Sequence, residues 1–161
     1  MTDGATKSKV YVETTVISYL TALPSSDVVL AAHQQISREW WQRRDRFDLF
    51  VSQAVLREAA RGDVEAAARR LAAVEGVPVL AVGAEALQLA DRFLRRRVIP
   101  AKAEVDAVHI AVAVVNGMDY LLTWNCTHIA NAAIRAKIEH TCRDMGLQPP
   151  IICTPEEPME E

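Results

Sequence analysis

The chain has 161 residues, which suits a single domain with a hydrophobic core. Half of its residues are apolar, 24% are charged and the net charge is −3, which argues against a generally basic surface for nucleic acid but leaves a local positive groove open. No apolar run is long enough to span a membrane, and residues 1–9 are polar, unlike a signal peptide. The three cysteines form no CxxC pair, which favours a reducing compartment. We therefore expect one cytoplasmic domain over residues 1–161, with no membrane partner.

Short apolar runs alternate with helical patterns along the chain. The expected strands cover residues 9–12, 48–52, 77–82, 120–123 and 151–153. The expected helices are a short one at 16–20, a long one from Asp27, one that carries Glu58, and those at 63–76, 84–97, 100–117 and 133–145. A frayed tail at 1–8 precedes them, and an acidic tail at 155–161 follows them. This alternation predicts βαβ units with right-handed crossovers and a parallel sheet.

Polar residues and prolines indicate where several elements begin. Ser26 is expected to cap the long helix that starts at Asp27, and Ser52 to cap the helix after the second strand. Trp40 repeats at helical spacing with other apolar residues, which indicates a core position. Pro78 near the start of the third strand favours an edge position for that strand.

Asp106 is the most unusual acid in the chain, because nearly all its neighbours are Ala, Val or Ile. Pro100 suits the first position of its helix and Gly117 suits the stop, which would place Asp106 about two turns inside. A carboxylate among apolar side chains is costly unless it is paired, hydrogen-bonded or bound to a metal. For Asp106 taken alone, pairing with an arginine or capping of a neighbouring backbone is favoured slightly over a metal. His109, one turn later, either orients Asp106 or is a satisfied core histidine.

Other polar groups follow the predicted strands. Glu13 comes directly after the first strand, Asn125 after the fourth, and Glu58 lies on the helix after the second. In open α/β sheets the crevice lies at the carboxyl ends of the strands, so these groups would meet if the first and fourth strands are neighbours. Converging carboxylates repel each other, and a hard divalent cation such as Mg²⁺ or Mn²⁺ relieves the repulsion. Each acid taken singly is better explained as a cap or a surface charge.

Four motifs, taken together in this order and spacing, resemble the PIN-domain ribonucleases, and most closely the VapC-like toxins of toxin–antitoxin pairs. They are YVETTVIS at 11–18, VS-x3-LRE at 51–58, DAVHIA at 106–111 and LLTWN at 121–125. The resemblance implies a three-layer α/β/α fold with a five-stranded, mainly parallel sheet. It also implies an endoribonuclease that depends on Mg²⁺ or Mn²⁺, forms a homodimer and is inhibited by a small cognate antitoxin.

The resemblance also assigns site residues by position. Glu13 stands where the family usually has its first Asp, and Asn125 where many members have a fourth Asp. The implied catalytic residues are Glu13, Glu58, Asp106 and Asn125. Glu13 and Asp106 would hold the metal. Thr14 and Thr123 would hydrogen-bond to the acids without contacting the metal themselves. Because Glu13 is one methylene longer than Asp and Asn125 is uncharged, the alternative is a degenerate PIN domain that binds RNA or a protein partner without cleavage.

Two other kinds of site have weaker support in the sequence. Cys126 and His128 offer two zinc ligands, but no second pair at ligand spacing accompanies them. A metal-dependent phosphatase with an aspartyl nucleophile would need an acidic motif after the first strand, which Glu13-Thr14-Thr15 does not supply.

Overall fold

The computed structural model describes residues 6–157 and 159 of the chain. Residues 1–5 of the expected N-terminal tail and 158, 160 and 161 of the expected acidic tail lie outside this part. The central feature is a five-stranded sheet in the order β3-β2-β1-β4-β5, and every pairing in it is parallel. Its strands are β1 (Lys9–Val12), β2 (Asp48–Ser52), β3 (Val79–Leu80), β4 (Tyr120–Leu122) and β5 (Ile151–Cys153). The predicted parallel sheet is confirmed.

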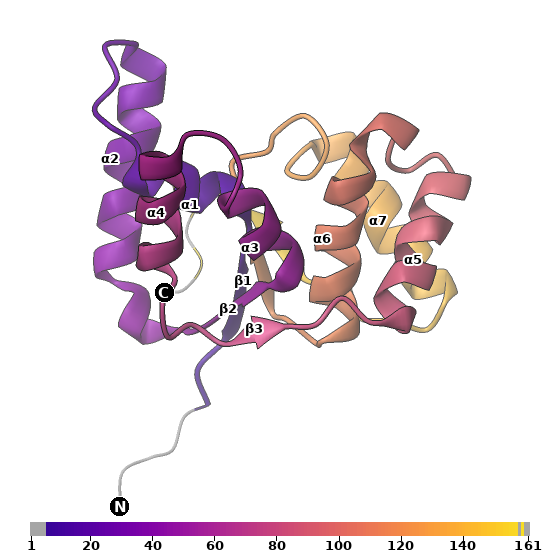
Figure 1. The fold of residues 1–161 in the computed structure, drawn as a ribbon. Coiled ribbons are helices and arrows are strands. Elements are labelled where there is room, and N and C mark those ends of the chain that lie inside the picture. Colours follow the sequence, from indigo (N-terminus) through magenta and orange to yellow (C-terminus); the bar gives the residue numbers. More distant parts are fainter. Residues whose placement is uncertain (1–5, 158, 160–161) are drawn as a thin grey trace, which may run out of the picture.

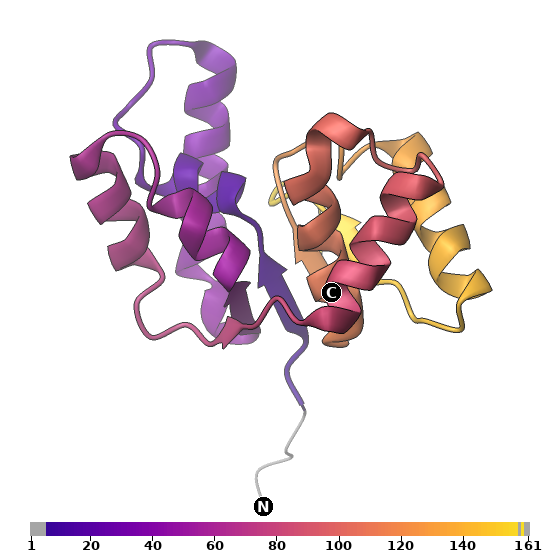
Figure 2. The same ribbon diagram turned by 45° about the vertical axis from the view of Figure 1, so that its right-hand side comes forward.

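Helices cover both faces of this sheet. In Figures 1 and 2, α1 to α4 gather on one side of the strands and α5 to α7 on the other. These helices are α1 (Thr14–Thr21), α2 (Val28–Gln42), α3 (Gln53–Ala59), α4 (Val64–Ala73), α5 (Ala84–Arg95), α6 (Glu104–Val115) and α7 (Ala132–Asp144), with 3-10 turns at Arg44–Arg46 and Ala101–Ala103. The three-layer α/β/α architecture is therefore confirmed. Among the described residues no helix is long and apolar enough to cross a membrane.

Strand β1 lies at the centre of the sheet, between β2 and β4. Tyr11 is in register with Phe50 on one side and with Leu121 on the other. The chain winds from β1 towards β3 in one direction and returns to β4 on the other side of β1, so the winding direction switches between β1 and β4. A switch point of this kind opens a crevice at the carboxyl ends of the two strands. The first and fourth strands are neighbours, which is the condition under which the sequence predicted that the polar groups after the strands would meet.

Burial explains why the strands read as continuous apolar runs. Val10, Tyr11 and Val12 have no exposed surface, because helices cover both faces of a parallel sheet. Trp40 is buried as expected and stacks on Phe47, with the ring centroids 5.5 Å apart.

The C-terminal segment packs on this core. The Tyr120 hydroxyl donates to the Met159 carbonyl at 2.5 Å, and the Trp40 indole N–H donates to the Met159 sulfur at 3.2 Å. Met159 is buried as a result, with 8% of its surface exposed. Residues 155–157 and 159 of the expected acidic tail therefore lie against the domain.

The third strand is shorter than expected. Only Val79 and Leu80 pair with β2, where the sequence predicted a strand over 77–82. Pro78 has no N–H to donate, although its carbonyl accepts a hydrogen bond from the Val51 amide at 3.0 Å. The predicted edge position of this strand is confirmed by the sheet order.

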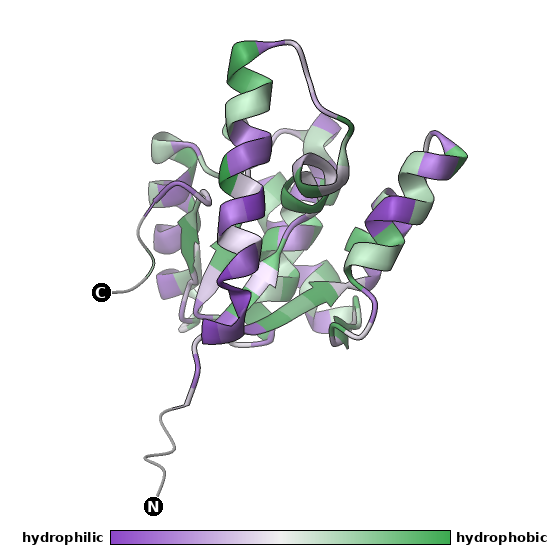
Figure 3. Cartoon of the chain, turned by 90° about the vertical axis from the view of Figure 1, so that its left-hand side faces the viewer, coloured by the Kyte–Doolittle hydropathy of each residue, from purple (hydrophilic) through white to green (hydrophobic). Residues whose placement is uncertain are grey.

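Helix α2 begins one residue later than expected. Asp27, and not Ser26, is its N-cap, and the Asp27 carboxylate accepts a hydrogen bond from the Leu30 amide at 3.0 Å. Both residue types can cap a helix, so the sequence alone did not separate them. Val28 and Val29 are exposed on the first turn, where Figure 3 shows the hydrophobic colour at the end of α2.

The cap assignment can be tested by substitution. Asp27→Ala should lower the free energy of unfolding by about 1 kcal/mol, because it removes the side-chain acceptor of the first turn. Ser26→Ala is the matched control and should change it by less than about 0.5 kcal/mol. Denaturant titration of both variants decides between the two caps. A larger loss in Ser26→Ala than in Asp27→Ala would contradict the structure.

Candidate active site

Glu13 lies at the carboxyl end of β1, where it also caps α1. Only 2% of its surface is exposed. Its Oε1 accepts hydrogen bonds from the Thr15 hydroxyl at 2.5 Å and from the Thr123 hydroxyl at 2.6 Å, and its Oε2 accepts from the Thr15 amide at 3.2 Å. Thr15 comes from α1 and Thr123 directly follows β4, so this buried carboxylate joins the two sides of the switch point.

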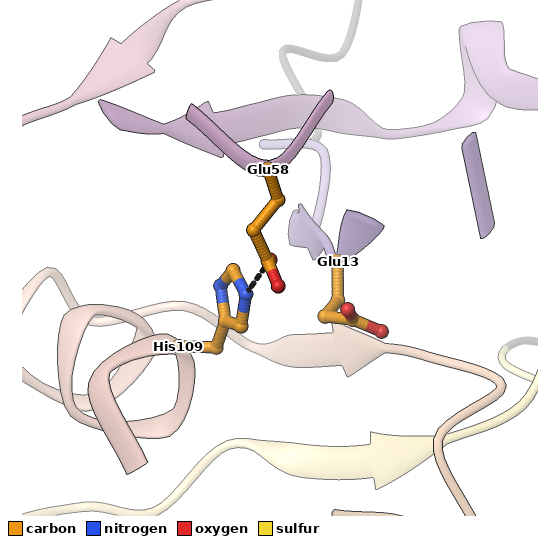
Figure 4. Close-up of side chains that lie close together, drawn as sticks. All are labelled: Glu13, Glu58 and His109. Carbon is orange, nitrogen blue, oxygen red and sulfur yellow. Dashed lines mark hydrogen bonds and ion pairs between the residues drawn. The ribbon is translucent and has the colours of Figure 1, made fainter. Parts of the chain in front are cut away.

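Glu58 approaches Glu13 from α3, and His109 approaches both from α6. The Oε1 atom of Glu58 accepts a hydrogen bond from the Thr14 hydroxyl at 2.6 Å and lies 2.5 Å from Nε2 of His109. The other ring nitrogen of His109, Nδ1, lies 2.6 Å from the Tyr11 hydroxyl. One atom from each of Glu13, Glu58 and His109 lies within 4.8 Å of the other two, and Figure 4 shows the three side chains converging. His109 is fully buried, whereas 29% of the Glu58 side chain is exposed.

The three titratable groups shift each other's pKa. Burial opposes a charge on His109, but the hydrogen bond to Glu58 and the nearby carboxylates raise its pKa above the ordinary value. Burial also opposes a charge on Glu58, but the bond from His109 lowers its pKa overall. For Glu13 burial prevails and raises the pKa, although the His109 charge and the two threonine hydroxyls oppose it. The arrangement therefore favours an imidazolium–carboxylate pair beside a buried glutamate.

Asp106 does not lie where the sequence placed it. Helix α6 starts at Glu104, after the 3-10 turn at Ala101–Ala103, so Asp106 is in the first turn and not two turns inside. Pro100 begins the 3-10 turn instead of the α-helix, which is why the expected helix start is wrong. The Asp106 side chain is 19% exposed, and its Oδ2 lies 3.2 Å from Nδ1 of His128. The apolar side chains near Asp106 in the sequence are the buried residues of α6 that follow it, and they do not enclose its carboxylate.

Asn125 is held in the loop after β4. Its Oδ1 accepts a hydrogen bond from the His128 amide at 3.0 Å, and its backbone carbonyl accepts from the Ile129 amide at 3.2 Å and the Ala130 amide at 2.8 Å. This is the geometry of a loop cap, which fixes His128 beside Asp106. A catalytic role for Asn125 stays a prediction.

The structure thus brings together part of the expected site. Glu13 and Glu58 meet, while Asp106 sits one helical turn before His109 and outside the group of three. Thr14 and Thr123 do hydrogen-bond to the acids, Thr14 to Glu58 and Thr123 to Glu13. The metal pair of Glu13 and Asp106, and the catalytic roles as a whole, stay predictions.

Sequence reasoning missed Tyr11 and Thr15, considered His128 only as a zinc ligand beside Cys126, and left His109 between two alternatives. His109 contacts Glu58 and Tyr11, so the hydrogen-bonded core histidine is the alternative that fits. Tyr11 carried a signal: a tyrosine in the middle of a fully buried strand needs a partner for its hydroxyl.

Comparison with known proteins supports the fold. No family model and no curated protein sequence matches this chain. Among solved structures, it is similar to VapC20 of Mycobacterium tuberculosis, described as a toxin that cleaves the sarcin–ricin loop, with a TM-score of 0.58 and 20% identity over 74% of this chain and 92% of that one. It is also similar to VapBC2 of Rickettsia felis, described as bound to a DNA fragment from its promoter, with a TM-score of 0.57 and 12% identity over 91% of this chain and 98% of that one. The chain has the PIN-like fold, so the resemblance drawn from the four motifs is confirmed at the level of the fold.

The His109–Glu58 pair predicts a pH dependence of stability. Folding raises the pKa of His109, so its protonation stabilises the folded state. This contribution to the free energy of unfolding is complete below pH 6.5, the ordinary pKa of histidine, and is lost as the pH rises through the pKa of the folded state. The free energy of unfolding should therefore decline above pH 6.5, by no more than about 1.4 kcal/mol per pH unit for one group. Glu13, whose pKa is also raised, contributes a decline of the same sign that starts above its ordinary value of 4.5.

The His109 part can be isolated with two variants. His109→Gln should flatten the decline above pH 6.5 in thermal melts, because the titrating ring is gone. His140→Gln changes an exposed histidine on α7 and should keep the wild-type slope. An unchanged slope in His109→Gln would show that the ring carries no extra proton in the folded state.

Proposed function

We propose that the protein is a divalent-metal-dependent endoribonuclease and the toxin of a cytoplasmic toxin–antitoxin pair. The single observation that carries this proposal is the pair Glu13 and Glu58, which converges at the switch point of a PIN-like fold. Two glutamates from different elements, one of them buried, are costly to bring together for stability alone. Their position in the crevice, where α/β proteins bind ligands, favours a functional reason.

The donor set fits a hard cation. Each carboxylate has one oxygen held by the protein, namely Oε1 of Glu13 by two threonine hydroxyls and Oε1 of Glu58 by Thr14 and His109. The other oxygens are freer: Oε2 of Glu13 accepts one long bond from a backbone amide, and Oε2 of Glu58 has no partner within the described part of the chain. Oxygen ligands of this kind suit Mg²⁺ and Mn²⁺.

We propose that Glu13 and Glu58 hold the ion, with Asp106 and its partner His128 at the open side of the site. When bound, a divalent ion supplies a water of lowered pKa and offsets charge on a phosphate. Glu58 would orient the attacking water through its free oxygen. In such a hydrolysis the water oxygen would bond to phosphorus as the bond from phosphorus to the 3′-oxygen breaks. The proton lost by the water would pass to solvent, and solvent would protonate the leaving 3′-oxygen. Asn125 would contribute by fixing the loop that holds His128.

The partners follow from the same proposal. The similarity to VapC20, a toxin that cleaves an RNA loop, supports RNA as the substrate class. We extend the family resemblance to a small cognate antitoxin and to a homodimer. The exposed apolar side chains Val28 and Val29, at the start of α2, offer a surface for a protein partner. Co-expression with the product of an adjacent short reading frame should give a stable complex, and failure to form one would count against the toxin assignment.

Metal binding should appear as stabilisation. At a Mn²⁺ concentration a hundredfold above its dissociation constant, the wild type should gain about 2.7 kcal/mol of unfolding free energy. Glu13→Gln and Glu58→Gln should lose most of this gain, because each removes a charged ligand. Asp106→Asn should lose less than either; a loss as complete as theirs would restore Asp106 as the second ligand. Glu139→Gln, which changes an exposed acid on α7, is the control and should respond like the wild type.

RNA cleavage tests the activity itself. Purified protein should cut single-stranded or structured RNA in the presence of Mg²⁺ or Mn²⁺ and stop when EDTA is added. Glu58→Gln should fold and yet cleave at least a hundredfold more slowly, while Glu139→Gln should cleave normally. Equal cleavage in chelator would contradict the metal mechanism. Metal binding without cleavage of any RNA in a diverse set would favour the non-catalytic binding module instead.

A further inference from the structure

We propose that Tyr11 and His109 form a positioning unit that aims Glu58 into the site. This inference rests on the proposed metal-dependent function, because the position of Glu58 matters only if its free oxygen has something to bind. Neither residue would touch the ion or the substrate. Their effect would pass entirely through the Glu58 carboxylate.

The unit is part of a closed ring of contacts between three layers of the fold. Oγ of Ser52 accepts a hydrogen bond from the Val55 amide at 3.3 Å and so caps α3, the helix that carries Glu58. The same oxygen lies 2.8 Å from the Tyr11 hydroxyl, which lies 2.6 Å from Nδ1 of His109. Nε2 of His109 then reaches Glu58 at 2.5 Å and closes the ring. The start of α3 and the side chain near its end are therefore fixed by one chain of hydrogen bonds.

The ring of contacts joins three fully buried side chains to Glu58, which is partly exposed. Tyr11, Ser52 and His109 have no exposed surface, whereas 29% of the Glu58 side chain is exposed. With a partner at each ring nitrogen, the imidazole of His109 cannot turn without breaking a buried hydrogen bond. A glutamate otherwise retains much rotamer freedom. Here Thr14 and His109 hold the same oxygen, so the direction of the other oxygen is set.

The chemistry of the ring favours positioning over plain stability. Buried polar networks are seldom more stable than apolar side chains of similar size, so a core that served only the fold would have little need of Tyr, His and Ser at these positions. The ring also ends on a carboxylate that reaches solvent. Groups that hold metal ligands in place commonly change metal affinity 10- to 100-fold when they are mutated.

Tyr11→Phe is the direct test, because it removes one hydroxyl and leaves the ring of the side chain in place. With Mn²⁺ alone as the probe, calorimetric titration should give an affinity about tenfold weaker than that of the wild type. Thermal melts should still show one cooperative transition. Tyr120→Phe is the matched control: its hydroxyl donates to the Met159 carbonyl instead of the site, and its Mn²⁺ affinity should be that of the wild type.

Two variants of His109 give an independent test if Tyr11→Phe fails to fold. Gln can still donate a hydrogen bond to Glu58 and Leu cannot, so the Mn²⁺ affinity should fall in the order wild type, His109→Gln, His109→Leu. Equal affinity in these two variants, or wild-type affinity in Tyr11→Phe, would overturn the positioning role and leave the metal site standing.

Pulsed electron paramagnetic resonance of the bound Mn²⁺ separates positioning from direct ligation. We expect no coupling to a directly bound nitrogen in the wild type. A nitrogen coupling that disappears in His109→Gln would make His109 a ligand and contradict the inference. Absence of any Mn²⁺ binding to the wild type would overturn the proposed function and this inference together.

Discussion

The constraint on which the site depends is a carboxylate buried at the end of the central strand. Glu13 is almost without exposed surface, and an isolated carboxylate in such a place would be strongly unfavourable. Thr15 and Thr123 supply hydroxyl donors, and the nearby His109 lowers the pKa of Glu13 against the effect of burial. Polar side chains therefore surround Glu13 at the switch point, although Val10, Tyr11 and Val12 of the strand that leads to it are fully buried.

The sheet topology explains how distant parts of the chain supply these groups. Because β1 pairs with both β2 and β4, the carboxyl ends of three strands meet around Glu13. Helix α3 follows β2 and delivers Glu58, and α6 covers the opposite face and delivers His109. The contact between His109 and Tyr11 joins residues 98 positions apart, and that between Thr123 and Glu13 joins residues 110 apart. A parallel α/β fold brings residues that are far apart in the sequence together at the carboxyl ends of its strands.

Much of the fold could be predicted from the sequence, because strand and helix periodicity is local and the alternation of elements implies a parallel sheet. The convergence of Glu13 and Glu58 also followed, since Glu13 lies directly after β1 and Glu58 lies on the helix that follows β2. The position of Asp106 did not, because one proline started a 3-10 turn where the pattern read as an α-helix. The partners of His109 and His128 depend on side-chain contacts across the fold, which no local pattern encodes. The loop-capping geometry of Asn125 also could not be predicted, because the sequence alone does not distinguish a side-chain oxygen that caps a loop from one that binds a metal.

His109 and three threonine hydroxyls hold the two acids in place, and Oε2 of Glu58 has no hydrogen-bond partner within the described part of the chain. The central claim is that this oxygen and the freer oxygen of Glu13 hold a divalent ion. A crystal structure of the protein soaked with Mn²⁺ tests it most directly through the anomalous signal of the metal. The account predicts an anomalous peak within ligand distance of Glu13 and Glu58, with His109 still bonded to Glu58 and Tyr11. A peak held by Asp106 and His128 away from Glu58, or no peak at saturating Mn²⁺, would contradict it.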